Sequence, residues 1–125
     1  MKKVESRVAV ITKREDGILS LRFKENAIIE AEDQDHHRDF FIELAEGKKR
    51  PILFSSEPNV TLTKEARERA AANEALTPIL ALAIVADSLA YKLIANFYIK
   101  FHKPLTPFKV FTSEGKAVEW LKTFL

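Results

Sequence analysis

The sequence has no cysteine, only three glycines and a single tryptophan in 125 residues. The absence of cysteine excludes disulfides and cysteine-ligated zinc or iron–sulfur sites. The glycines, Gly17, Gly47 and Gly115, lie too far apart to form the loop that holds phosphates in P-loop or dinucleotide-binding proteins. The chain also has no serine elbow of the hydrolase type. We therefore name no catalytic residue, expect no cofactor, and lean toward a protein that is not an enzyme.

Neither a large charge imbalance nor a long apolar run is present. The 20 basic and 18 acidic residues leave a net charge of +2, which gives no global attraction to nucleic acid. The longest apolar run, residues 78–86, is shorter than the roughly 18 residues that span a bilayer. The charged residues 1–7 are not followed by the apolar run of a signal peptide. We expect a cytoplasmic protein without a membrane span and without a nucleic-acid partner.

What the chain does have is enough apolar residues for one core. They make up 46% of the sequence, and a chain of this length buries roughly two thirds of its unfolded surface. No linker or repeat interrupts it, so we expect residues 1–125 to form a single α/β domain.

The apolar patterning predicts five strands and four helices. The strands are expected at 8–12, 18–23, 51–54, 79–85 and 108–111, and the helices at 33–46, 63–75, 88–102 and 113–125. Asp16-Gly17 is a hairpin turn signal, Gly47 a helix end, and Thr63 and Ser113 are helix N-caps. The order β-β-α-β-α-β-α-β-α implies a mixed, mostly parallel sheet with an N-terminal β-hairpin.

Several local strings resemble known small bacterial domains of the STAS-like and SEC14-like group, often called SpoIIAA-like. They are residues 16–19 (DGIL), 63–69 (TKEARER), 95–97 (ANF), 103–111 (KPLTPFKVF) and 120–121 (WL). The resemblance implies a STAS-like fold and a role in binding and regulation, within an uncharacterised branch of that group.

The resemblance also implies two activities. In STAS-type anti-sigma-factor antagonists, a serine that opens a helix after a strand is phosphorylated, and the phosphate controls partner binding. Asp87 and Ser88 lie at such a junction, although the glycines that follow the serine in the family are missing here. In SEC14-type relatives an apolar cavity holds a lipid. A phosphate at Ser88 would also face the free N–H groups of a helix N-terminus, while the structural alternative is an ordinary helix cap.

The predicted helix at 88–102 is apolar on more than one side. Ser88, Lys92, Asn96 and Lys100 form one polar stripe, and almost all other positions are apolar. Three alternatives fit: packing inside the chain, a homodimer interface, and a groove for a lipid or other apolar small molecule. The candidate interface or groove residues are Tyr91, Lys92, Ile94, Asn96, Phe97, Tyr98 and Phe101.

Two further features have simpler structural explanations. No acidic residue lies between Asp87 and Glu114, which favours a local anion-binding face, but lysines near a helix C-terminus are expected from the helix dipole. Within residues 33–39 two His–Asp pairs share a helix face, yet a zinc site needs at least three protein ligands. We therefore expect no metal. The hypothesis is a non-catalytic regulatory or protein-interaction module that self-associates, with an apolar-ligand carrier as the alternative.

Overall fold

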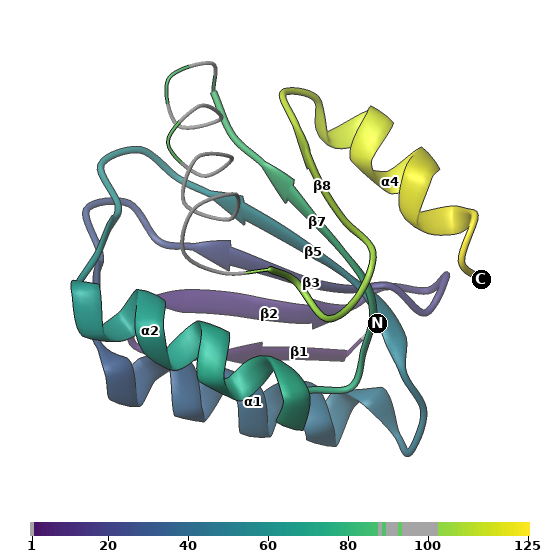
Figure 1. Cartoon of the computed structure of the whole chain (residues 1–125), viewed down its shortest axis with the longest axis horizontal. Helices are drawn as coiled ribbons and strands as arrows, with labels where there is room; N and C mark the ends of the chain where they lie inside the picture. The colour runs from purple at the N-terminus through teal and green to yellow at the C-terminus, as the bar shows by residue number, and fades with distance from the viewer. Residues whose placement is uncertain (1, 88, 90–92, 94–102) are drawn as a thin grey trace.

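A computed structural model describes residues 2–87, 89, 93 and 103–125 (Figure 1). Six strands form one sheet in the order β1-β2-β3-β5-β7-β8. Their bounds are β1 Lys2–Glu5, β2 Ala9–Lys13, β3 Leu19–Phe23, β5 Arg50–Ser56, β7 Ile79–Val85 and β8 Phe108–Phe111. A separate parallel pair joins β4 Ile28–Ile29 to β6 Thr61–Leu62. The helices whose bounds the described residues give are α1 Ala31–Ala45, α2 Lys64–Asn73 with the 3₁₀ turn η1 Glu74–Leu76, and α4 Glu114–Lys122.

The predicted mixed, mostly parallel sheet is confirmed. β1 and β3 run antiparallel to β2, whereas β3, β5, β7 and β8 pair in parallel. The hairpin between β2 and β3 turns at Gly17, whose φ of +90° is a backbone conformation that glycine adopts without strain.

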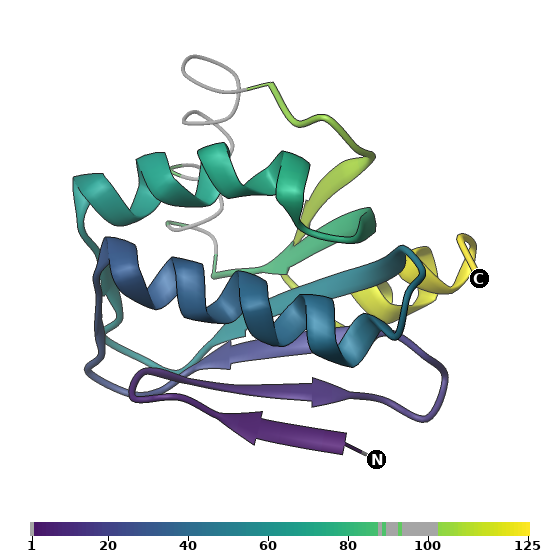
Figure 2. The same cartoon turned by 90° about the horizontal axis from the view of Figure 1, so that it is seen from below.

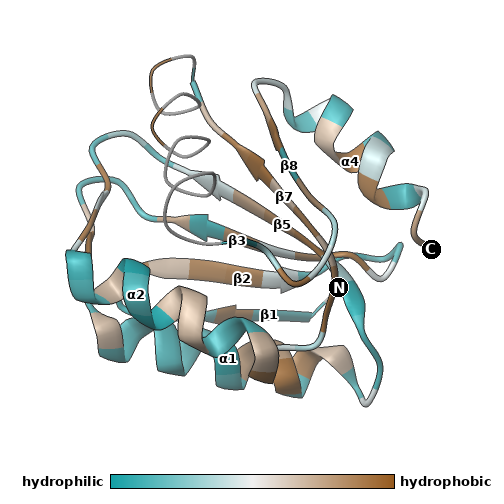
Figure 3. Cartoon of the chain, viewed as in Figure 1, coloured by the Kyte–Doolittle hydropathy of each residue, from teal (hydrophilic) through white to brown (hydrophobic). Residues whose placement is uncertain are grey.

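Two layers of helix sandwich the sheet. α1 and α2 lie side by side on one face, and α4 lies on the other (Figures 1 and 2). Strand β7 is hydrophobic along its length (Figure 3), because alternate residues face the two cores. Leu82 and Ile84 belong to the core under α1, while Ala81 and Ala83 belong to the core under α4.

The predicted helix caps are present. Thr63 Oγ1 accepts a hydrogen bond from Ala66 N–H at 3.0 Å, and Ser113 Oγ accepts one from Lys116 N–H at 3.4 Å. At the end of α1 two successive residues have left-handed backbone. They are the C-cap Glu46, with a φ of +54°, and Gly47, with a φ of +83°. The prediction that assigned the left-handed position to Gly47 was therefore right, but incomplete.

The structure also contains strands that the sequence pattern did not predict. β1 carries exposed lysines and a glutamate instead of alternating apolar residues, as is common for edge strands. β4 and β6 have only two residues each, too few to show a period. Of the predicted helix at 88–102 the structure describes only Leu89 and Leu93, both helical. None of the described helices is long and apolar enough to cross a membrane.

Candidate binding cleft between α1 and α2

All of the predicted site residues except Asp87 lie outside the described residues. Those outside are Ser88, Tyr91, Lys92, Ile94, Asn96, Phe97, Tyr98 and Phe101. Asp87 is described: it is exposed, and it lies two residues beyond the carboxyl end of β7. The described residues bring together a different site, which the sequence did not predict.

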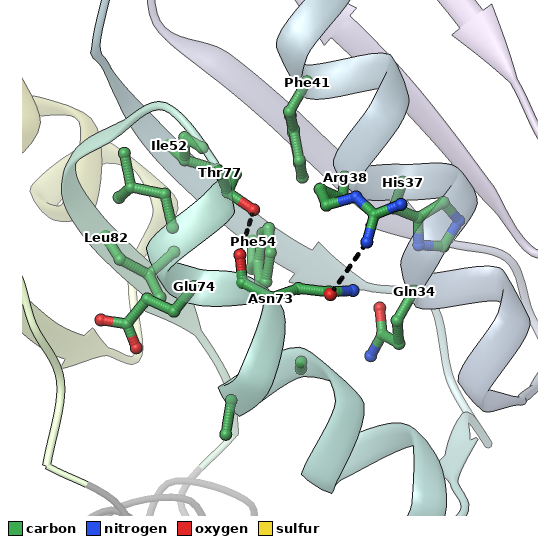
Figure 4. Close-up of a pocket in the computed structure, with 13 residues that line it drawn as sticks. Gln34, His37, Arg38, Phe41, Ile52, Phe54, Asn73, Glu74, Thr77 and Leu82 are labelled. Atoms are coloured by element: carbon green, nitrogen blue, oxygen red, sulfur yellow. Dashed lines mark hydrogen bonds between the residues drawn. The ribbon is translucent and has the colours of Figure 1, made fainter.

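This site is a cleft between α1, α2 and the sheet, with an inner volume of about 60 Å³ (Figure 4). Its apolar wall includes Phe41 of α1 and Phe54 of β5, whose rings stack with centroids 6.0 Å apart. Leu82 of β7 also lines it. The polar side chains Gln34, His37, Arg38 and Asn73 line it as well. The cleft thus has a mainly apolar wall and a polar end.

Helix α1 positions the cleft through a four-residue spacing. Asp33, His37, Phe41 and Ala45 are all buried, and the spacing places them along one face of the helix. At the start of the helix, Asp33 Oδ2 accepts hydrogen bonds from Glu30 N–H at 2.8 Å and from Arg7 Nη2 at 2.6 Å. The buried carboxylate is therefore paired with a cation and with the helix N-terminus.

A polar network joins α1 to α2 beside the cleft. Arg38 Nη1 donates to Asn73 Oδ1 at 3.1 Å, and Asn73 Nδ2 donates to Asp35 Oδ1 at 2.9 Å. Arg69 of α2 pairs with Asp35 Oδ2. The hydrogen bond from Asn73, with the charges of Arg69 and Arg38, holds the pKa of Asp35 below its ordinary value. Asn73 is itself buried, and both ends of its amide are used in this network.

His37 is the least exposed of these polar residues, at 2%. Its Nε2 lies 3.0 Å from Ser6 Oγ, which also accepts hydrogen bonds from the N–H groups of Val8 and Ala9. Within the described part of the chain, His37 Nδ1 has no hydrogen-bond partner. Burial lowers the pKa of His37 to about 4 against the opposing charge of Asp33, so the ring is neutral at pH 7.

The two His–Asp pairs within residues 33–39 do not form a metal site in the described part of the chain. Asp33 binds Arg7, and His36 is exposed. No group of three or more His, Cys, Asp or Glu residues in the described ranges could hold a metal.

A second hollow, of about 390 Å³, lies on the opposite face of the sheet over β2, β3 and β5. Its arginines are already paired, Arg14 with Asp16 at 3.2 Å and Arg22 with Glu57 at 2.7 Å. The hollow therefore offers hydroxyl groups and the carboxylate of Glu114 to a ligand, but Ser55 is its one buried polar residue. The cleft, where His37 and Asn73 are both buried, is the stronger candidate.

Sequence reasoning missed the cleft because its polar groups come from distant positions. Ser6 meets His37 across 31 residues, and Arg38 meets Asn73 across 35. The one available signal was the four-residue spacing of Asp33, His37 and Phe41, which marks a buried helix face but does not reveal which partners that face meets.

The comparisons with known proteins agree with this architecture. No curated protein matches the chain. A crystal structure of an uncharacterised protein of the DUF3478 family with a SpoIIAA-like fold, from Shewanella loihica PV-4, is similar with a TM-score of 0.59 at 17% identity. The similarity covers 94% of this chain and 98% of that one, and it establishes a SpoIIAA-like fold. The family model described as a domain of unknown function, DUF7793, matches residues 12–125, and the chain therefore belongs to the DUF7793 family.

Proposed function

We propose that this chain is a non-catalytic regulatory module that binds a second copy of itself. The observation that carries the proposal is the exposure of Leu89 and Leu93, which are 71% and 64% exposed. Both have helical backbone, and in the helix predicted for residues 88–102 their spacing of four would place them on one face. Neighbouring exposed leucines on one helix face are a common feature of protein interfaces.

Two further leucines are exposed: Leu105, which follows this segment in the chain, and Leu76, which lies in η1 before β7. Leu105 is 68% exposed and Leu76 is 62% exposed. The N–H of Leu105 donates to Glu74 Oε1 at 2.5 Å, which holds the 103–107 loop against the turn that carries Leu76. Leu76 and Leu105 therefore add exposed apolar surface at the contact between this turn and the loop.

A second copy is the occupant that the sequence favours. Besides Leu89 and Leu93 the 88–102 segment carries eight apolar residues, including Tyr91, Phe97, Tyr98 and Phe101. Aromatic residues are enriched at interface cores. The segment has no acidic residue, so it offers no charge pattern that selects a basic partner. Closed twofold pairing of identical patches is the commonest form of assembly in soluble proteins.

Asp87 and Ser88 give this module a point of regulation. They follow β7, and ligands commonly bind beyond the carboxyl ends of parallel strands. A phosphate on Ser88 would place about two negative charges beside the leucine-bearing segment, and this would change the affinity of the copies for each other. The missing glycines after Ser88 distinguish this junction from the STAS pattern.

The alternative function, a carrier of a lipid or another apolar molecule, would need the larger hollow over β2, β3 and β5, of about 390 Å³, because the cleft is too small. The cleft holds about 60 Å³, whereas a cavity of roughly 150 Å³ is needed to enclose benzene. Native mass spectrometry of the purified protein distinguishes the two functions. A bound mass that disappears on denaturation favours the carrier, and a ligand-free dimer favours the interaction module.

The proposal is tested by sedimentation velocity on Leu89→Asp and Leu93→Asp. A charge at either position should convert the dimer to a monomer, because an unpaired carboxylate cannot be buried in an apolar interface. Ile42→Asp is the matched control, since Ile42 is 49% exposed on α1. Circular dichroism should show that all three variants stay folded. An unchanged oligomeric state in both leucine variants would remove the assignment.

A further inference from the structure

The most deeply buried polar atoms of the cleft between α1 and α2 are out of reach of a ligand. His37 Nδ1 has less than 1 Å² of accessible surface, and both ends of the Asn73 amide are bonded within the network. The hollow on the opposite face of the sheet differs in this respect. The hydroxyl groups of Thr12, Ser20 and Ser55 line it, and none of them has a hydrogen-bond partner in the described part of the chain.

Strand pairing brings these three hydroxyl groups together. Thr12 of β2 lies opposite Ser20 of β3, and side chains in such positions are about 5 Å apart. Ser55 of β5 lies opposite Arg22, two residues further along β3, which places Ser55 roughly 8 Å from Ser20. Among the described helices α4 lies on this face, and it packs mainly on β5, β7 and β8 (Figure 1). The surface over β2 and β3 therefore stays open to a small molecule.

Ser55 is the clearest sign that this hollow takes a ligand. It is only 7% exposed and lines the hollow, but its hydroxyl group bonds to no other group of the described structure. Buried polar side chains nearly always have a partner, so the partner of this hydroxyl is expected to enter from the hollow. Ser55 also lies close to the carboxyl end of β5, and ligands commonly bind at the carboxyl ends of strands in α/β sheets.

The charges around the hollow are balanced. They belong to residues that line it, to their ion-pair partners, and to β1 residues that lie opposite Thr12 and Val10 on the same face. The positive residues are Lys3, Arg14, Arg22 and Lys24, and the negative ones are Glu5, Asp16, Glu57 and Glu114. An ion that entered the hollow would lose hydration and gain no net opposite charge in return. The hollow therefore favours a neutral ligand.

The lining also favours a polar ligand over an apolar one. Its apolar residues are Val10 and Leu53, and Leu53 is only 2% exposed. Hydroxyl groups both donate and accept, the Glu114 carboxylate accepts, and the arginines keep N–H groups beyond those in their ion pairs. A ligand with several hydroxyl groups matches such a mixed set. The volume of about 390 Å³ lies within the range of roughly 300–1,000 Å³ that is typical of small-molecule sites.

We propose that this hollow binds a neutral polyhydroxylated molecule of monosaccharide size through hydrogen bonds to the hydroxyl groups of Thr12, Ser20 and Ser55. Val10 supplies the apolar surface on which the C–H groups of the ligand lie, and Glu114 accepts from a hydroxyl group at the rim. None of the leucines of the self-association surface takes part, and neither proposal depends on the other.

NMR titration of the full chain with D-glucose and with myo-inositol tests the proposal. At least one of them should give saturable shifts at the backbone amides of Thr12, Ser20 and Ser55. We expect a Kd on the order of 1 mM, because an open hollow buries little apolar surface. Cyclohexanol, a similar ring with one hydroxyl group, and glucose 6-phosphate, which adds charge, should each bind about tenfold more weakly or worse. Equal or tighter binding of either would contradict the proposed ligand class.

Two neighbouring serines locate the binding. Ser55→Ala removes the buried hydroxyl group and should weaken binding about three- to tenfold, whereas Ser56→Ala, at the adjacent exposed position, should bind like the wild type. Thr12→Val keeps the shape of a half-buried side chain and should weaken binding by a similar factor. Unchanged binding in Ser55→Ala or in Thr12→Val, or no saturable shift in the wild type with either probe, would overturn the proposal. The last result would mean that water alone occupies the hollow.

Discussion

Ser6 Oγ in the turn between β1 and β2 lies 3.0 Å from Nε2 of His37 on α1. This contact joins the edge of the sheet to the helix that covers it, and it orients the imidazole ring at the polar end of the cleft. The same hydroxyl accepts from two backbone N–H groups of the turn. One side chain therefore joins the turn to the ring of His37.

Ser6→Ala should lower the free energy of unfolding by about 1–3 kcal/mol, because it leaves buried polar groups of the turn and of His37 unpaired. Urea denaturation followed by fluorescence of Trp120 measures the loss. Ser20→Ala is the control, since Ser20 is half-buried on the opposite face of the sheet. It should change stability by no more than about 0.5 kcal/mol. An equal effect of both substitutions would show that the Ser6 contact contributes nothing specific.

His37 should make stability depend on pH between about 6.5 and 4. Its pKa is lowered in the folded chain to about 4 from the ordinary 6.5, so the unfolded chain binds the proton first as the pH falls. The stabilisation is complete above pH 6.5, declines as the pH falls, and levels off below pH 4. A shift of this size corresponds to about 3 kcal/mol.

Denaturation at a series of pH values tests this expectation. His37→Phe should flatten the pH dependence in that window, whereas His36→Phe, at an exposed position on the same helix, should leave it unchanged. If the stability of His37→Phe and of the wild type changes with pH in parallel, the buried ring is not the source of the pH dependence.

Asn73 should contribute to stability through both of its partners. Asn73→Ala removes the hydrogen bond that Asn73 donates to Asp35 and the one that it accepts from Arg38. We expect the free energy of unfolding to fall by about 1–3 kcal/mol. A double-mutant cycle with Asp35→Ala isolates the contact between these two residues and should give a coupling of about 0.5–3 kcal/mol. Strictly additive effects would mean that the network between α1 and α2 is not cooperative.

Gly47 and Gly115 should respond to alanine in opposite directions. Gly47 has a φ of +83° with open space around its Cα, so Gly47→Ala should cost about 1 kcal/mol through backbone strain alone. Gly115 lies in α4, where an added Cβ would make an ordinary contact with Ser113 Oγ at 3.8 Å. Gly115→Ala should therefore raise stability by about 0.5–1 kcal/mol. Thermal denaturation of the two variants measures both effects, and a stabilised Gly47→Ala would contradict the assigned turn.

Elements with a strong local signal could be predicted from the sequence. The strands Ile79–Val85 and Phe108–Phe111 have the predicted bounds, and the Thr63 and Ser113 caps form the predicted bonds. The α1 helix begins two residues earlier than predicted. Ala31 and Glu32 already have helical backbone, and Glu30 is the N-cap.

The site could not be predicted, because it depends on contacts between distant segments. Asp33 and His37 were paired in the sequence as metal-ligand types, but Arg7 takes the carboxylate and Ser6 takes the imidazole. Both partners come from the turn after β1, a strand with no apolar pattern. Which side chains a buried helix face meets is decided by strand pairing, and the pairing of β1 with β2 leaves no signature in either strand alone.

Self-association is best tested by sedimentation of the wild-type chain over a wide concentration range. We expect a species of twice the 14.2 kDa chain mass that dissociates on dilution. We also expect that Leu89→Asp abolishes this species while Ile42→Asp does not. A single species of one chain mass at every concentration would contradict self-association as the function of this domain.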